Sequence, residues 1–152
     1  MYTLMMTIAT GFYVGRLPVA PGTWGSALAL PIHFLLVRLS FPAHLSALAI
    51  ILVVAIITAG SVEKMMDTKD PGIIVIDEII GMLITLVGAP HNYLVWVLGF
   101  FIFRFFDIFK PFPIRLIDQR INGGVGIVMD DVMAGLYSLI VLQLICRIFF
   151  VQ

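Results

Sequence analysis

Long apolar stretches fill most of this chain, and polar residues separate them at short intervals. A helix that crosses a bilayer needs roughly 20 mostly apolar residues, within a range of about 17–25. Five stretches come close to this length, and Pro31 interrupts the shortest of them. They cover residues 24–37, 43–62, 72–89, 93–109 and 125–151. The pattern predicts an all-α fold, a polytopic membrane bundle of about five spanning helices in a single domain over residues 1–152.

A shorter apolar segment precedes these stretches. Residues 1–14 are too few to cross a bilayer, and they lead into a stretch at 15–25 that is rich in glycine and proline. Such a segment is typical of a helix that lies in the membrane interface or re-enters it.

Composition supports a lipid environment. Apolar residues make up 61% of the chain, and the mean hydropathy is +1.12. A soluble domain is usually about 45–50% apolar, so the surplus here must face something other than water. Nine basic and nine acidic residues balance, which leaves no basic excess for nucleic acid. The expected partner is therefore the lipid bilayer and not nucleic acid.

The loop cations indicate an orientation. If the spans alternate in direction, six loop cations fall on one face and two on the other. The six are Arg16, Lys64, Lys69, Lys110, Arg115 and Arg120, and the two are Arg38 and Arg147. Short loops rich in Lys and Arg stay in the cytoplasm, so the first face is expected to be cytoplasmic. The protein is then expected to be a multi-pass protein of the cytoplasmic (inner) membrane.

The same alternation places all nine carboxylates toward the cytoplasmic side of the membrane, in its loops or in the nearer halves of the spans. Five of them lie inside predicted spans, and the first two are expected about two turns into theirs. These five are Asp77, Glu78, Asp107, Asp130 and Asp131. The three histidines, His33, His44 and His91, lie toward the opposite face. Acids within membrane segments are costly unless they are paired or bind a cation, so they mark functional sites.

Two interpretations of the five acids remain open. Arg104 could pair with one acid while the others reach water at the interface. Alternatively, the acids of three helices could converge on Mg²⁺, which takes a few carboxylates together with water and substrate phosphate. Adjacent residues on a helix point about 100° apart, so one member of each adjacent pair is expected to bind metal and the other to orient a water or a cation.

Basic and hydroxyl side chains near these acids are candidate phosphate contacts. Arg104, Asp107 and Lys110 follow one another at intervals of three, just before Pro111, which places two cations and one acid on one helix face. They could hold a phosphate or form a salt-bridged face. Hydroxyl groups at the start of the first span could cap a helix whose N-terminus attracts anions. The candidate substrate-binding residues are Thr23, Ser26, Lys69, Arg104 and Lys110.

Together these segments resemble the phosphatidylglycerophosphatase A family over about residues 11–135. The matching residues are Gly15-Arg16-Leu17-Pro18-Val19-Ala20-Pro21-Gly22-Thr23-Trp24-Gly25-Ser26, Asp70-Pro71, Ile76-Asp77-Glu78 with Gly81, Phe103-Arg104 with Phe106-Asp107, Lys110-Pro111 with Pro113, Gly123-Gly124 with Gly126, and Asp130-Asp131 with Ala134-Gly135. The resemblance implies a magnesium-dependent bacterial enzyme that removes the terminal phosphate of phosphatidylglycerophosphate, giving phosphatidylglycerol and inorganic phosphate.

Other phosphatase chemistries fit the sequence less well. A thiolate mechanism needs a cysteine beside a phosphate-binding arginine, but Cys146, the only cysteine, lies toward the opposite face. The histidines lie away from the acids, and the chain has no Asp-x-Asp after a strand. Metal-centred hydrolysis remains, with water or a side chain such as Asp130 or Thr23 as nucleophile. The alternative function is an ion- or proton-coupled transporter, although such sites lie near the midplane between internal repeats, and this chain shows no repeat.

Overall fold

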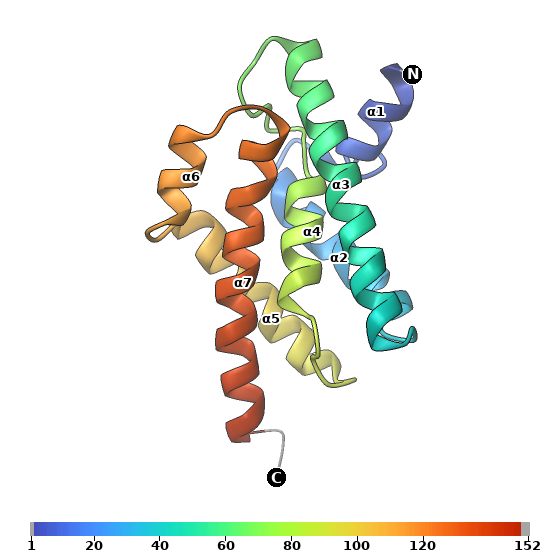
Figure 1. The fold of residues 1–152 in the computed structure, drawn as a ribbon, viewed down its shortest axis with the longest axis vertical. Helices are drawn as coiled ribbons and strands as arrows, with labels where there is room; N and C mark the ends of the chain where they lie inside the picture. The colour runs from blue at the N-terminus through green and yellow to red at the C-terminus, as the bar shows by residue number, and fades with distance from the viewer. Residues whose placement is uncertain (1, 150–152) are drawn as a thin grey trace.

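The computed structural model describes residues 2–149, and within that range every regular element is a helix. The predicted all-α fold is therefore confirmed. The elements are α1 (Tyr2–Ala9), the 3₁₀ turn η1 (Val14–Arg16), α2 (Pro21–Leu36), α3 (Phe41–Met66), α4 (Ile76–Thr85), α5 (Tyr93–Phe109), α6 (Ile114–Arg120) and α7 (Gly123–Phe149). Figure 1 shows them in order along the chain.

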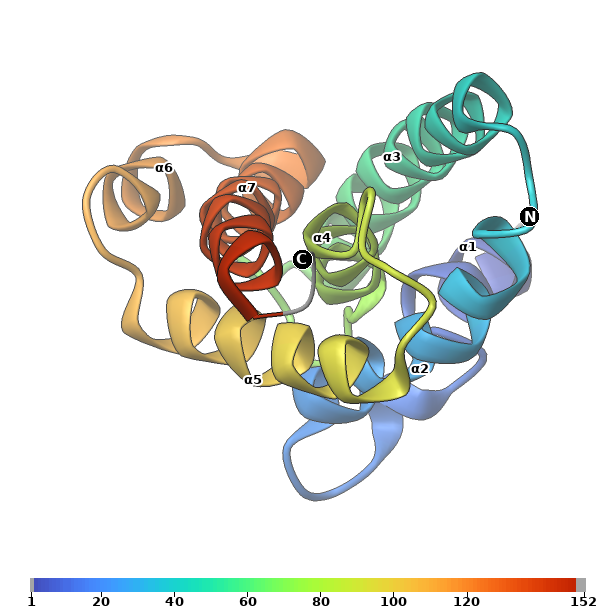
Figure 2. The same cartoon turned by 90° about the horizontal axis from the view of Figure 1, so that it is seen from below.

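The short helix α4 occupies the centre of the bundle. It contacts α2, α3, α5 and α7, and Figure 2 shows these four helices around it. Ile80, Met82 and Leu83 are fully buried on α4. Nearly all of α4 is buried, including Asp77 in its first turn, so it needs partners on almost every side, and here the partners are other helices of the protein.

Fewer helices have the length and composition of a membrane span than the five that the sequence predicts. Among residues 2–149, two helices are long and apolar enough to cross a membrane: α3 with 26 residues and α7 with 27. The other three predicted spans form helices of 16 (α2), 10 (α4) and 17 (α5) residues. The largest difference is at 72–89, where the apolar run serves to bury α4 inside the protein. Composition alone does not distinguish a helix covered by protein from one covered by lipid.

The loops separate into two ends, as the alternating directions predict. The connections after α3 and around α6 lie at one end of the bundle, and the α2–α3 and α4–α5 connections lie at the other (Figure 1). At the first end, the loop that follows α1 packs on the segment before α4. The Val75 amide donates to the Ala9 carbonyl at 2.9 Å, and a side chain at Gly15 would collide with the Ile73 carbonyl. The first turns of α2 and α4 are thereby brought together.

Glycines bring α4 and α7 into backbone contact. A Cβ added at Gly81 would lie 2.6 Å from the Asp131 carbonyl oxygen, and one added at Gly135 would collide with the Gly81 carbonyl. Small residues that allow such close approach are typical of helix contacts in membrane proteins. The contact fixes the position of Asp131 relative to the start of α4.

Gly135→Ala should therefore destabilise the protein by about 1–3 kcal/mol, because the added methyl group forces α7 away from α4. The change is measured as a lower melting temperature in detergent. Gly72→Ala is the matched control, because nothing lies within 4 Å of a Cβ added there. Equal melting temperatures for the two variants would contradict the close contact.

Candidate active site

A cavity of about 290 Å³ opens where the first turns of α2 and α4 meet the end of α5 and the early turns of α7. Its charged lining comes from α4 and the loop before it, from the end of α5 and from α7, whereas α2 contributes Pro21 and Gly22. The acids are Asp70, Asp77, Glu78, Asp107, Asp130 and Asp131, and the cations are Arg104 and Lys110. All five acids proposed from the sequence thus share one cavity.

The helix boundaries explain how the acids reach this cavity. The sequence suggested that Asp77 and Glu78 lie two turns inside a span. Because α4 begins at Ile76, they lie instead in its first turn. The partial positive charge at a helix N-terminus stabilises acids placed there. Asp107 lies in the last turn of α5, and Asp131 lies about two turns into α7, both as expected.

Three of the acids form a compact trio. One carboxylate oxygen from each of Asp77, Glu78 and Asp131 lies within 4.8 Å of the other two. Asp77 Oδ1, Glu78 Oε2 and Asp131 Oδ2 are buried and have no hydrogen-bond partner within the described residues. Buried like charges at this separation repel one another, and buried oxygens without partners are costly. The trio therefore offers negative charge and carboxylate oxygens that are free to act as ligands, which suits a divalent cation such as Mg²⁺.

The adjacent pairs behave differently from each other. Asp77 and Glu78 both contribute an oxygen to the trio, although their directions from the helix differ by about 100°. At the second pair the roles separate, because Asp131 belongs to the trio while Asp130 binds a cation. The expectation of one ligand per pair therefore suits the second pair better than the first.

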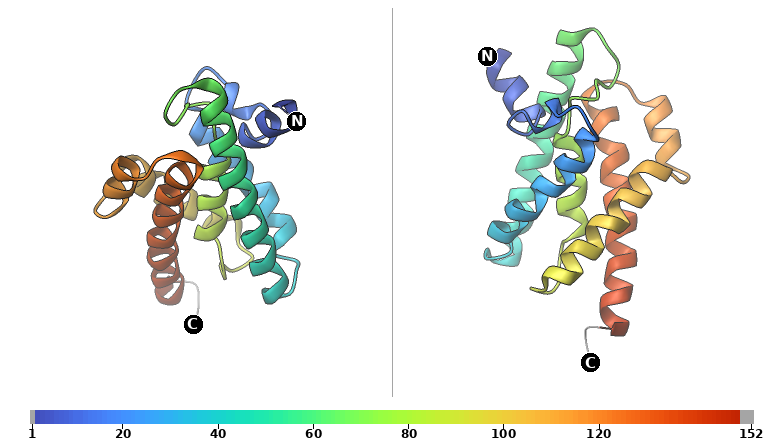
Figure 3. Two further views of the ribbon diagram at one scale, coloured as in Figure 1. Left: turned by 45° about the horizontal axis from the view of Figure 1, so that its top comes forward. Right: turned by 180° about the vertical axis from the view of Figure 1, so that it is seen from behind.

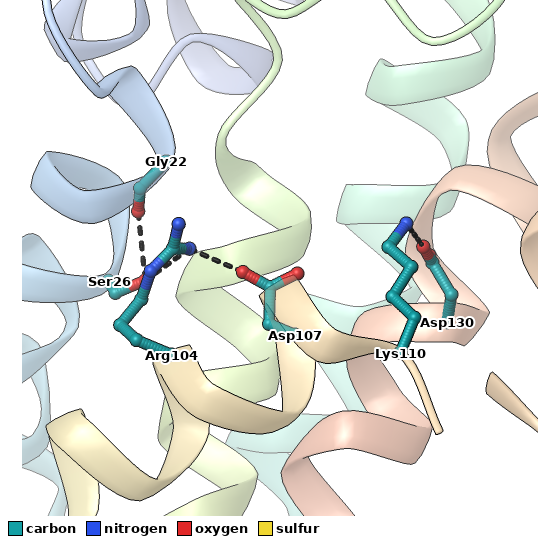
Figure 4. Close-up of polar contacts among 6 residues, drawn as sticks. All are labelled: Gly22, Ser26, Arg104, Asp107, Lys110 and Asp130. Atoms are coloured by element: carbon teal, nitrogen blue, oxygen red, sulfur yellow. Dashed lines mark hydrogen bonds and ion pairs between the residues drawn. The ribbon is translucent and has the colours of Figure 1, made fainter. Parts of the chain in front are cut away.

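Lys110 is held against Asp130. Its Nζ donates to Asp130 Oδ2 at 2.6 Å (Figure 4), and it lies 3.2 Å from Asp118 Oδ1. Burial by itself lowers the pKa of Lys110, but the bonds to the two acids outweigh it and raise that pKa above its ordinary value. Lys110 consequently stays protonated at physiological pH and presents a fixed positive charge to the cavity.

Arg104 connects α5 to α2. Its guanidinium donates to Asp107 Oδ2 at 2.5 Å and to Ser26 Oγ at 3.4 Å, and the Ser26 hydroxyl donates to the Gly22 carbonyl at 2.8 Å (Figure 4). A Cβ at Gly22 would collide with Glu78 Oε1 and lie 3.3 Å from Arg104. Gly22 thus leaves the room that lets the arginine and the carboxylate trio share the cavity.

Only some of the residues proposed to bind phosphate lie at the cavity. Arg104 and Lys110 line it, and Ser26 is buried beside Arg104. Thr23 does not line the cavity, and Lys69 Nζ instead donates to the Asp118 carbonyl at 3.2 Å. The set predicted from the sequence lacked Asp70 and Gly22. Their place in the Gly15–Ser26 and Asp70-Pro71 motifs was the available signal.

The remaining reactive side chains lie elsewhere. His33, His44 and His91 gather around or near Trp96 at the opposite end of the bundle, with 4.9 Å between the His33 and Trp96 ring centres. Cys146 is buried 15 residues beyond Asp131 on α7, about 22 Å along the helix. Neither a phosphohistidine nor a cysteinyl-phosphate mechanism has its nucleophile at this cavity.

Comparison with known proteins agrees with this chemistry. The family described as Phosphatidylglycerophosphatase A matches residues 7–146. The chain is 40% identical to Phosphatidylglycerophosphatase A of Escherichia coli K12 over 132 residues, which are 86% of this chain and 77% of that protein. It is 38% identical to Phosphatidylglycerophosphatase A of Haemophilus influenzae over 136 residues, covering 88% of this chain and 83% of that protein.

A third relative carries a different name. The chain is 38% identical over 146 residues to a protein of Bacteroides thetaiotaomicron whose name provisionally assigns it as a phosphatidylinositol-3-phosphatase. The match covers 91% of each chain. No solved structure is significantly similar to this chain.

Proposed function

The chain belongs to the phosphatidylglycerophosphatase A family, and from this premise we propose that it converts phosphatidylglycerophosphate to phosphatidylglycerol and inorganic phosphate, with Mg²⁺ as cofactor, at the cytoplasmic face of a bacterial membrane. The observation that carries the proposal is the trio Asp77, Glu78 and Asp131, each with one buried oxygen that has no hydrogen-bond partner in the part of the chain that the structure describes. Such a set suits a cation that in turn binds a phosphate.

Each charged group of the cavity has a role in phosphate-ester hydrolysis. Asp77, Glu78 and Asp131 would hold Mg²⁺, which when bound neutralises phosphate charge and increases the acidity of a coordinated water. Arg104 and Lys110 face the same cavity and bind phosphate oxygens. Asp107 orients Arg104, and Asp130 orients Lys110.

A proton acceptor for the attacking water is also available. Asp130 accepts from Lys110 through Oδ2, whereas its Oδ1 is buried and has no hydrogen-bond partner among residues 2–149. We assign this oxygen as the acceptor of the water proton when the water oxygen attacks phosphorus. The bond from phosphorus to the glycerol oxygen breaks, and the glycerol oxygen leaves as a hydroxyl with the proton returned from Asp130. Thr23 lies outside the cavity, which favours water as the nucleophile over this hydroxyl.

The transporter interpretation has no support. The acids line a cavity at one end of the bundle, beside loops, whereas transporter sites lie near the membrane midplane. The relatives with matching names are enzymes.

The proposed substrate is tested with purified protein in detergent micelles containing Mg²⁺. Phosphate release from phosphatidylglycerophosphate should exceed that from phosphatidylinositol 3-phosphate by at least about tenfold in kcat/KM, the difference expected when one or two hydrogen bonds of about 1 kcal/mol each are lost. A preference for the inositol lipid would transfer the assignment to the activity named for the Bacteroides relative.

The proposed orientation rests on the cations at the cavity end of the bundle, and cysteine labelling tests it. Thr68 is exposed in the connection after α3, and Ser40 is exposed in the connection before it. A membrane-impermeant maleimide should label Thr68→Cys in everted vesicles and Ser40→Cys in intact spheroplasts. Cys146 is buried and gives the background. The reverse pattern would place the cavity on the outer face.

A further inference from the structure

A second hollow lies between the same two helices that carry Ser26 and Arg104. It has a volume of about 280 Å³ and is found toward the end of α2 and the start of α5. Its lining consists of Leu30, Pro31, Phe34, Tyr93, Trp96 and Val97. The right-hand view of Figure 3 shows α2 and α5 on the side of the bundle that faces the reader. The residues of the hollow come from the C-terminal half of α2 and the first turns of α5.

The hollow and the catalytic cavity both lie along the line where α2 faces α5, which we call the α2–α5 seam. Ser26, Leu30 and Phe34 are spaced four residues apart and therefore share one face of α2. On α5, Val97 and Arg104 are seven residues apart and likewise share a face. Since Arg104 donates to Ser26 Oγ at 3.4 Å, this face of α2 and this face of α5 are turned toward each other.

The length of the seam suits a lipid tail. Ser26 and Phe34 are about 12 Å apart along the helix axis. One leaflet of the hydrocarbon core is about 15 Å deep, half of roughly 30 Å. An acyl chain whose head group binds at the cavity would therefore pass the hollow before it reaches the bilayer midplane.

The walls of the hollow are apolar and, on one side, rigid. Phe34 and Val97 are exposed, so the hollow is open to the bilayer. Trp96 is held in place, because its indole N–H donates to the Pro90 carbonyl at 3.0 Å and its ring packs edge-on against His33. A fixed aromatic wall beside exposed aliphatic side chains favours a flexible alkyl chain as the occupant.

We propose that this α2–α5 hollow binds an acyl chain of the lipid whose phosphate occupies the carboxylate cavity, an inference that rests on the proposed function. The phosphate is held by charged groups at one end of the seam, and the tail is held by Leu30, Phe34 and Val97 at the other. The seam thereby gives affinity for a membrane-embedded ester over a soluble phosphate of the same head group.

Val97→Trp tests the proposal by filling the hollow. Its KM for a dioleoyl substrate should rise by at least about tenfold, the loss expected when two or so methylene groups are no longer buried. Its kcat/KM for the dihexanoyl form of the same lipid should fall much less, so the dioleoyl-to-dihexanoyl ratio of kcat/KM should fall. Val53→Trp is the matched control, since Val53 is exposed on α3 and lines neither hollow. Val53→Trp should change neither constant.

The outcomes distinguish a wrong acyl-chain assignment from a wrong proposed function. If wild type hydrolyses both substrates and Val97→Trp leaves their ratio unchanged, the acyl assignment is wrong and the phosphatase remains. If wild type releases phosphate from neither substrate, both the acyl assignment and the phosphatase function are wrong.

A second measurement uses unmodified protein and a dioleoyl-length substrate analogue with a diazirine near the chain end. Labelling should fall on residues 30–34 or 93–97, and excess dihexanoyl substrate should suppress it. Labelling confined to α3 would overturn the assignment.

Discussion

Asp131→Asn is expected to lower kcat for phosphate release by about 10²–10³-fold, the loss typical when one preorganised electrostatic contact to the transition state is removed. Asparagine keeps the size of the side chain but removes one of the three charges that converge with Asp77 and Glu78. Steady-state phosphate release in micelles, over a range of Mg²⁺ concentrations, measures the change. Higher Mg²⁺ should restore part of the rate if weaker ion binding contributes to the loss.

Asp67→Asn is the matched control for this substitution. Asp67 is exposed at the end of α3, where its φ of 47° is one that asparagine also tolerates, and it does not line the cavity. Its activity should be unchanged. Chelation of divalent ions should bring wild type down to a rate near that of Asp131→Asn, and should lower the variant much less. Two changes that act on one ion are not additive.

Thermal stability separates an ion-binding role from a structural one. Without divalent ions, Asp131→Asn should melt no lower than wild type, because it relieves repulsion among buried carboxylates. Mg²⁺ should raise the melting temperature of wild type, since a ligand that binds only the folded state stabilises it, and should raise that of the variant less. A variant that melts well below wild type without metal, yet retains its turnover, would identify Asp131 as a structural residue only.

The sequence predicted helices best where local signals end them. The predicted stretch 93–109 coincides with α5, because the Asn92 side chain accepts a hydrogen bond from the Leu94 amide at the start and Pro111 follows shortly after the end. The stretch 72–89 lacks such signals. Its helix starts late, at Ile76, because the preceding residues form turns that pack against the α1 loop. That packing is a tertiary contact, and no local pattern in the sequence reports it.

In the candidate site, too, the contacts between neighbours in the sequence could be predicted, whereas the contacts between distant residues could not. The Arg104–Asp107 pair could be predicted, because residues three apart on a helix are neighbours. The Lys110–Asp130 pair joins residues 20 positions apart and depends on how α5 approaches α7. The exclusion of Lys69 from the cavity likewise follows from its contact with α6 and not from its neighbours in the sequence. Charge patterning therefore predicted which residues gather, whereas their pairing needed the packing.

Gly22→Ala is expected to lower kcat/KM by about 10–100-fold, because a displacement of about 1 Å at a catalytic group can cost as much as 10²-fold. The added methyl group would occupy the position of Glu78 Oε1 and crowd the Arg104 guanidinium. The helix itself should not suffer, since alanine is a better helix former than glycine. Phosphate release and the melting temperature should be measured together, and only the first should fall markedly.

Two comparisons make this prediction specific. Gly72 also lines the cavity but has open space around an added Cβ, so Gly72→Ala should retain activity within about twofold. A double-mutant cycle with Glu78→Asp then isolates the clash, because the shorter carboxylate withdraws the oxygen that the methyl group would meet. Gly22→Ala should cost less in the Glu78→Asp background than in wild type. Equal costs in both backgrounds would mean that Gly22 acts on something other than the position of Glu78, and the account of how α2 and α4 share the cavity would have to change.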